Sequence, residues 1–186
     1  MKTLAESEFK SGMAEIIKAA IIGDRDLFKK LNERKINPTD EEALEEIIAR
    51  AVRVKKRFVE TDWEDRGPRH ILNFGHTYGH AIEALSGFTL PHGLAVAQGM
   101  VMVAKQAQEW NLIHEDVVGE IEKVLEIQEI PYELNFREEK IISKAMGDKK
   151  VEENLIKLAI PYKIGEGKVL EIDLKGFSQG KLLALQ

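Results

Sequence analysis

The stretch GMAEIIKAAII, residues Gly12–Ile22, decides the class of fold, because nearly all of its residues are compatible with a helix and many favour one strongly. Gly23 follows directly, and glycine is common where helices end. Only Glu15 and Lys18 interrupt the apolar character of this stretch, and their spacing of three places them on one helix face. The sequence therefore predicts a mostly apolar helix that carries a carboxylate beside an ammonium group.

Further helical segments are predicted along the chain. Thr39 is predicted as an N-cap, with Glu42 three residues later, for a helix that reaches about Phe58. The other helices are predicted over residues 24–31, 69–85, 94–111, 116–128 and 138–146, with connections at 61–68 and 86–93.

The last part of the chain has a different pattern. Short β-rich runs at 155–162 and 168–174 flank Ile164–Gly167, and this arrangement predicts a hairpin. Residues 176–185 are predicted as a last turn or short helix. We expect a mainly α fold, a multi-helix domain with a small C-terminal β-hairpin, formed by residues 1–186 as a single helical domain.

The composition excludes several classes of function. The chain has 186 residues, of which 44% are hydrophobic and 32% charged, as in ordinary globular proteins. It has no cysteine, which excludes disulfides, a thiolate zinc site and a cysteine nucleophile. The net charge of -5 argues against nucleic acid as a partner. No apolar run is long enough to span a membrane, and the first ten residues contain no apolar signal-peptide core, so we expect a cytoplasmic protein without a membrane partner.

Three of the five histidines fall between positions 76 and 92. His76 and His80 are four residues apart and share one predicted helix face, and His92 stands at a turn before an apolar helix. Imidazoles from two such helices can converge on a divalent cation such as zinc. The same spacing also occurs at ordinary polar positions of exposed helices, so both interpretations remain open from spacing alone.

Glu15 and Lys18 also allow two interpretations. Their helix face could simply meet water. Alternatively they could be a carboxylate ligand beside a catalytic or substrate-binding ammonium group, because buried ions need a partner or a bound ligand.

Cationic and amide side chains occur together in the segment that begins at Arg69. Arg69, Asn73, His76 and His80 lie along one stripe of the predicted 69–85 helix, a combination suited to an oxygen-rich anionic substrate. The runs Lys55-Lys56-Arg57 and Asp148-Lys149-Lys150 add cations, although such runs are usually solvated surface.

Two glycines interrupt the same predicted helix. Gly75 and Gly79 would each weaken an exposed helix by about 1 kcal/mol relative to alanine. Their presence is explained if another backbone or a ligand approaches closely at these positions.

The segment RHILNFGHTYGHAIEA, residues 69–84, closely resembles the signature of the 3-dehydroquinate synthase family. Residues 11–18 resemble the first helix of that family's second domain. His92-Gly93 followed by Ala95-Val96-Ala97 resembles its second metal-ligand turn, and residues 148–150 resemble its late lysine motif. The resemblance runs from about Ser7 to Gly165 and implies the helical C-terminal fold of this family.

The resemblance implies a role for each matching residue. Glu15, His76 and His92 match the zinc ligands of the family, and cobalt accepts similar ligands. The positions that match contacts to substrate carboxylate, hydroxyls or phosphate are Lys18, Lys55, Arg69, Asn73 and His80. Lys149 or Lys150 would reach the substrate phosphate. The family converts a seven-carbon keto acid phosphate, DAHP, to 3-dehydroquinate and phosphate in the shikimate pathway, with transient oxidation by NAD.

Two features depart from the family pattern. The family binds NAD mainly through an N-terminal α/β half, which we expect this chain to lack, so that the chain alone would be an incomplete catalyst. Its partners would then be that NAD-binding half and further copies of itself, because a missing domain exposes apolar surface. Leu94 stands where the family usually has a glutamate, and we expect the loss of that carboxylate to affect the orientation of His92.

The sequence leaves three alternatives to a 3-dehydroquinate synthase domain. The chain could belong to a related sugar-phosphate cyclase or to a metal-dependent polyol or alcohol dehydrogenase. It could also be a non-catalytic fragment that docks onto an NAD-binding partner.

Overall fold

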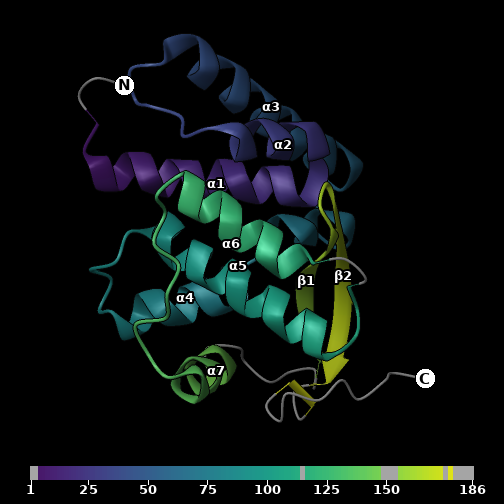
Figure 1. Cartoon of the computed structure of the whole chain (residues 1–186). Coiled ribbons are helices and arrows are strands. Elements are labelled where there is room, and N and C mark those ends of the chain that lie inside the picture. The colour runs from purple at the N-terminus through teal and green to yellow at the C-terminus, as the bar shows by residue number, and fades with distance from the viewer. Residues whose placement is uncertain (1–3, 114–115, 148–154, 174–175, 178–186) are drawn as a thin grey trace.

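The computed structural model describes residues 4–113, 116–147, 155–173 and 176–177, and the structural statements below concern these residues. Its helices and strands are α1 Glu6–Gly23, α2 Arg25–Glu33, α3 Glu41–Thr61, the 3-10 helix η1 Pro68–Asn73, α4 His76–Leu85, α5 His92–Glu109, α6 Val117–Ile127, α7 Glu138–Gly147, β1 Leu155–Lys163 and β2 Glu166–Asp173. The predicted mainly α fold with a C-terminal hairpin is confirmed (Figure 1). Of the predicted segment 176–185, only residues 176 and 177 lie within the described ranges.

Helix α1 crosses the middle of the molecule (Figure 1). It contacts α2 and α3 on one side and α5 and α6 on the other, while α4 lies between α5 and α7. The hairpin lies along one edge and contacts α1, α5 and η1. Helix α5 is almost completely buried from Gly93 to Ala104, as expected for a helix that is apolar on all sides.

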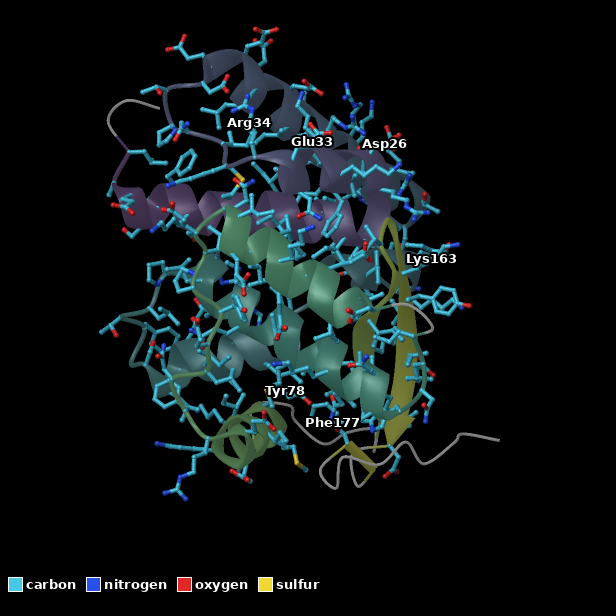
Figure 2. All side chains as sticks on the ribbon, viewed as in Figure 1. Asp26, Glu33, Arg34, Tyr78, Lys163 and Phe177 are labelled. Atoms are coloured by element: carbon cyan, nitrogen blue, oxygen red, sulfur yellow. The ribbon has the colours of Figure 1, made fainter. Side chains whose placement is uncertain are left out.

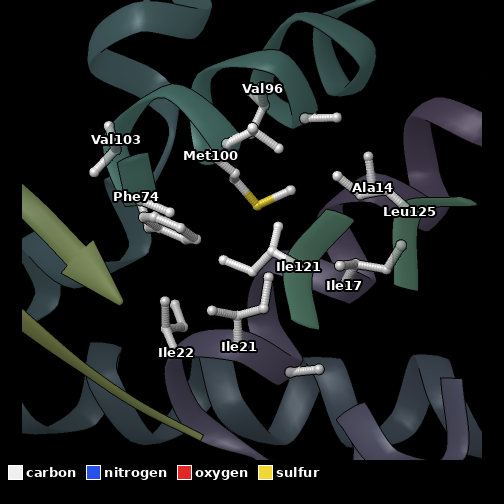
Figure 3. Packing of buried hydrophobic residues seen from close by; sticks show 14 of the residues in the cluster. Ala14, Ile17, Ile21, Ile22, Phe74, Val96, Met100, Val103, Ile121 and Leu125 are labelled. Carbon is white, nitrogen blue, oxygen red and sulfur yellow. The ribbon is translucent and has the colours of Figure 1, made fainter. Parts of the chain in front are cut away.

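One hydrophobic cluster joins these elements. Ile17 and Ile21 of α1 meet Met100 of α5 and Ile121 of α6, and all four are fully buried (Figure 3). Ile17 and Ile21 belong to the same helix as Glu15 and Lys18, so the packed core fixes the position of the helix that carries those two side chains.

The hairpin is antiparallel, with Leu158 opposite Leu170. Its turn places Gly165 at φ 87°, a left-handed conformation that favours glycine, and the Gly165 N–H donates to the carbonyl oxygen of Ile21 at 2.8 Å. The hairpin turn is thereby fastened to the end of α1. Beyond the hairpin, the ring of Phe177 stacks on Tyr78 of α4, with centroids 5.6 Å apart (Figure 2).

The prediction of one helix over residues 69–85 is wrong. The segment forms η1, bends at Phe74 and Gly75, and resumes as α4. Gly75 has φ 79°, which no α-helix accommodates, and a side chain there would collide with the carbonyl oxygen of Val96 and with Met100. Packing against α5 therefore causes the break.

Several helix starts also differ from the predictions. Helix α5 begins at His92, two residues before the predicted start, so His92 and Gly93 belong to the helix and not to the connection. The N-cap of α3 is Asp40 and not Thr39, because the Asp40 carboxylate accepts a hydrogen bond from the Ala43 N–H at 3.1 Å. Helix α1 begins at Glu6, six residues before the predicted stretch.

The expected close approach at the two glycines is confirmed. An alanine Cβ at Gly79 would lie 3.1 Å from the Cα of Val96. From the other side, a Cβ at Gly99 of α5 would lie 2.1 Å from the carbonyl oxygen of Gly75. The backbones of α4 and α5 therefore touch, which brings the histidines of the two helices together. None of the helices in the described ranges has the length and apolar character needed to cross a membrane.

Candidate metal and substrate site

A backbone contact places the start of α5 against α1. The Gly93 N–H donates to the hydroxyl of Ser11 at 2.9 Å, and a Cβ at Gly93 would lie only 2.1 Å from the Ser11 carbonyl oxygen. Ser11 precedes Glu15 by about one helical turn, and His92 precedes Gly93. This contact therefore sets His92 beside Glu15.

Glu15, His76 and His92 converge on one point. Oε1 of Glu15 lies 3.8 Å from Nε2 of His92 and 4.0 Å from Nε2 of His76. This oxygen is buried and has no hydrogen-bond partner. The three residues offer ligand atoms that all lie within 4.8 Å of one another.

The hydrogen bonds of the two imidazoles determine which nitrogens are available. Nδ1 of His76 is 3.2 Å from the carbonyl oxygen of Phe74, and Nδ1 of His92 is 3.1 Å from Oε2 of Glu83. Both partners accept hydrogen bonds, so each Nδ1 carries the proton in the neutral ring. The Nε2 lone pairs then face the Glu15 oxygen, and electron-rich atoms in such an arrangement repel one another unless a cation lies between them.

This donor set fits a zinc-like ion. Two imidazole nitrogens and one carboxylate oxygen are the ligands of several catalytic zinc sites, which keep a fourth position open. Ligand atoms around a tetrahedral zinc lie about 3.3 Å apart, so the Glu15 oxygen would have to approach Nε2 of His92 and of His76, now 3.8 and 4.0 Å away, to share one ion with them. Glu15, His76 and His92 would hold the ion.

The ammonium groups of Lys18 and Lys55 both pair with Oε2, the other carboxylate oxygen of Glu15. Nζ of Lys18 donates to Oε2 at 2.8 Å, and Nζ of Lys55 lies 3.7 Å from the same atom. Lys18 is only 2% exposed, so the interpretation of this face as simply solvated is wrong. With Oε2 paired to ammonium groups, Oε1 remains available to a cation.

The protonation of these groups follows from burial and charge. Burial lowers the pKa of His76 to about 4, and the nearby Lys18 ammonium contributes to the same shift. Burial opposes ionisation of Glu15, but the charges of Lys18, His76 and Lys55 together with the Lys18 hydrogen bond leave its pKa below the usual value. Burial lowers the pKa of Lys18, against the opposing effect of Glu15. His76 is therefore neutral and Glu15 ionised near pH 7, the forms that bind a metal.

A cavity of about 550 Å³ opens in front of this group. Its lining residues are Glu15, Lys18, Lys55, Val59, Asp65, Arg69, Leu72, Asn73, His76 and His92. Every predicted site residue within the described ranges lines this cavity except His80. The exposed His80 ring is adjacent, with its centroid 5.3 Å from that of His76 and 5.9 Å from that of His92. Lys149 and Lys150 lie outside the described residues.

The predicted single stripe of Arg69, Asn73, His76 and His80 is wrong in its geometry. Arg69 and Asn73 come from η1, and the two histidines come from α4 beyond the bend at Gly75. Arg69 and Asn73 nevertheless reach the same cavity as His76, because the bend redirects the chain.

The loop before η1 is organised by one carboxylate. Asp62 accepts hydrogen bonds from the N–H groups of Gly67 at 2.7 Å and Arg69 at 3.2 Å. The Arg69 guanidinium donates to the carbonyl oxygen of Trp63 at 3.1 Å. These contacts hold Arg69 at the edge of the cavity.

Sequence reasoning missed two acidic residues at the site. Asp65 lines the cavity, and its carboxylate lies 3.3 Å from Nδ1 of His70. It belongs to an acidic loop with no distinguishing pattern. Glu83 contacts His92. Its position seven residues after His76, two helical turns along α4, could have identified it in the sequence as a residue on the same helix face as that histidine. Leu94 offers no carboxylate, as expected, but Glu83 supplies one to His92.

The fold is shared with solved structures of two synthases. A 2-epi-5-epi-valiolone synthase from Streptomyces hygroscopicus subsp. jinggangensis, solved with NAD+ and Zn2+ bound, matches with a TM-score of 0.77 at 22% identity. The match covers 96% of this chain and 51% of that one. A 2-deoxy-scyllo-inosose synthase complexed with carbaglucose-6-phosphate, NAD+ and Co2+ matches with a TM-score of 0.75 at 20% identity, over 97% and 54% of the two chains. By fold, the chain belongs to the same class as about half of each of these two synthases.

The sequence comparisons identify the family. Residues 12–151 match the family described as 3-dehydroquinate synthase C-terminal. The 3-dehydroquinate synthase of Sulfurisphaera tokodaii is 41% identical over 190 residues, covering 96% of this chain and 54% of that protein. That of Dehalococcoides mccartyi is 40% identical over 174 residues, covering 92% and 48%. The chain belongs to the 3-dehydroquinate synthase family, and it spans about half the length of the curated relatives it matches.

Proposed function

We propose that this chain is the metal- and substrate-binding part of a 3-dehydroquinate synthase, which converts DAHP to 3-dehydroquinate and phosphate. The observation that carries the proposal is the buried Oε1 of Glu15, which has no hydrogen-bond partner and faces Nε2 of both His76 and His92. Family membership and the predicted ligand set support the same residues.

The cavity residues have complementary tasks in this proposal. Glu15, His76 and His92 would hold a zinc or cobalt ion, which would act as a Lewis acid toward a substrate hydroxyl and its neighbouring carbonyl. Lys18, Lys55 and Arg69 bind the carboxylate and phosphate oxygens of the substrate, and Asn73 hydrogen-bonds its hydroxyls. Holding both ends of the substrate orients the reacting carbon atoms.

His80 and the two late lysines complete the proposed substrate site. His80, adjacent to the two ligand histidines, contacts substrate at the edge of the cavity, and Lys149 or Lys150 reaches the phosphate. In this proposal NAD is bound mainly by an N-terminal α/β half, as the resemblance to the family implies. Residues 1–186 as a single helical domain, a homo-oligomeric state and a cytoplasmic location are parts of this proposal that rest on the sequence.

The main rival within the superfamily is a metal-dependent polyol or alcohol dehydrogenase. A simple alcohol carries no charge, so it gives no reason for three cations around one cavity. Lys18, Lys55 and Arg69 therefore favour the synthase. Release of phosphate from DAHP would support the synthase, and reduction of NAD+ with glycerol would support the dehydrogenase.

The first test is calorimetric titration of the metal-free chain with Zn2+. We expect one-to-one binding that Glu15→Ala and His92→Ala each weaken strongly, while Glu45→Ala on the exposed face of α3 leaves it unchanged. Binding that is absent, or indifferent to the first two substitutions, would refute the proposed metal centre. Phosphate release from DAHP is then measured with NAD+, after addition of the remaining half of the Sulfurisphaera tokodaii relative, to test the reaction itself.

A further inference from the structure

One carboxylate contacts the candidate metal centre from outside the cavity. Glu83 lies on α4, and its Oε2 is 3.1 Å from Nδ1 of His92. Its side chain is only 16% exposed, whereas that of His92 is 43% exposed. A carboxylate with so little access to water requires a partner, and the imidazole of His92 provides it.

We propose that Glu83 is a positioning residue for His92. It accepts the Nδ1–H hydrogen bond, holds the ring so that Nε2 faces Glu15, and increases the electron density on that nitrogen. The inference rests on the proposed function, because His92 acts as a ligand only if the centre binds a metal.

The two histidines of the centre differ in how they are held. Nδ1 of His76 faces the carbonyl oxygen of Phe74, a backbone atom fixed by the bend before α4, and the His76 side chain is 16% exposed. His92 is the first residue of α5, and its side chain is far more exposed. An exposed ring has more freedom to turn away from the centre, so His92 gains more from an orienting partner than His76 does.

Glu83 could instead be a ligand itself. His80, Glu83 and His92 also offer ligand atoms within 4.8 Å of one another. In the first arrangement Nε2 of His92 faces Glu15, whereas Glu83 lies beside Nδ1 of the same ring. We favour the first because Oε1 of Glu15 is buried without a hydrogen-bond partner, whereas Oε2 of Glu83 already has one.

The test compares Zn2+ affinity of the wild-type chain with that of Glu83→Ala, Glu83→Gln and the control Glu45→Ala. We expect Glu83→Ala to weaken binding about 10- to 100-fold, the usual cost of removing a partner of a ligand histidine. Glu83→Gln keeps an acceptor oxygen without the charge and should fall between Glu83→Ala and wild type. Glu45→Ala should equal wild type. Urea unfolding of the metal-free proteins verifies that each is folded. If Glu83→Ala does not fold, the comparison of Glu83→Gln with wild type decides the outcome.

A double-mutant comparison shows whether Glu83 acts through His92. In a His92→Ala background, the further change Glu83→Ala should alter the remaining affinity by less than about twofold. A loss in that background as large as in the wild type would overturn the inference. An equal loss of affinity in His80→Ala would make Glu83 a ligand and also overturn it.

The outcomes separate this inference from the proposed function. Failure of the wild-type chain to bind Zn2+ refutes the metal centre, and the role of Glu83 falls with it. Tight wild-type binding that neither Glu83 substitution changes refutes the role of Glu83 alone.

Discussion

Replacement of Gly93 by alanine should separate the two helices that carry Glu15 and His92. The added Cβ would lie 2.1 Å from the carbonyl oxygen of Ser11, and ordinary contacts begin near 3.4 Å. The backbones must therefore move apart by about 1.3 Å, because close-packed interiors have no free volume to absorb the methyl group. The three atoms nearest to the new Cβ all belong to the Ser11 backbone, so no side-chain rotation relieves the collision.

The cost of Gly93→Ala has two parts. Overpacking of this kind destabilises by about 1–3 kcal/mol, and loss of the hydrogen bond from Gly93 to Ser11 adds about 1 kcal/mol. The free energy of unfolding should fall by about 2–4 kcal/mol in total. Metal–ligand bond lengths vary by only about 0.2 Å, so a His92 displaced from Glu15 should coordinate poorly, and we expect the Zn2+ affinity to fall at least about tenfold.

Urea unfolding of the metal-free protein and Zn2+ calorimetry measure the two effects. Gly12→Ala is the matched control, because a Cβ there meets nothing within 4 Å and alanine should stabilise α1 by about 0.5–1 kcal/mol. Ser11→Ala removes only the hydrogen bond and should cost about 1 kcal/mol. If Gly93→Ala unfolds at the wild-type urea concentration and binds Zn2+ as tightly as wild type, the contact does not position His92.

Three further predictions concern charged groups. Lys18→Met should destabilise the metal-free protein by roughly 3 kcal/mol, because it leaves the partly buried Glu15 with only the more exposed and more distant Lys55 as a cationic partner. Urea unfolding should show that Zn2+ recovers part of this loss. Burial lowers the pKa of His76 to about 4 in the folded protein, below its ordinary 6.5. As pH falls, His76 is therefore protonated in the unfolded chain before it is protonated in the folded one. Stability of the metal-free protein should therefore decline as pH falls from about 6.5 to about 4, and His76→Gln should flatten that decline in urea midpoints. Burial opposes ionisation of Asp24, but hydrogen bonds from Arg50 and from the backbone leave its pKa below the ordinary 3.8. Its stabilisation is present above pH 3.8 and is lost as pH falls through the lower, folded-state pKa. Asp24→Asn should therefore cost about 1–2 kcal/mol at pH 7, and in thermal unfolding the difference from wild type should shrink as pH falls below 3.8.

Local patterns predicted most of the fold. The apolar stretch 12–22 predicted α1, and the runs around Ile164–Gly167 predicted the hairpin, because these signals lie within each segment. The break at Gly75 was not predictable locally. Its left-handed conformation is imposed by contact with Val96 and Met100, more than twenty residues further along the chain.

The sequence alone predicted some residues of the candidate site but did not determine how they come together. Spacing alone left His76 and His92 open to a non-metal interpretation, and only the family resemblance assigned Glu15 to the same centre. The buried, unpartnered Oε1 of Glu15 is a three-dimensional observation with no counterpart in the sequence. The contact between Glu83 and His92 crosses from α4 to α5, so it too required the helix packing.

The glycine contacts between α4 and α5, and between α5 and α1, have a thermodynamic consequence. Where Gly99 meets Gly75 and Gly93 meets Ser11, backbone lies against backbone, and neither partner has a rotamer that could adjust. The relative placement of the three helices is therefore settled during folding and not when a ligand arrives. An incoming ion or substrate meets a framework that has already lost its conformational freedom, so little further entropy is lost on binding.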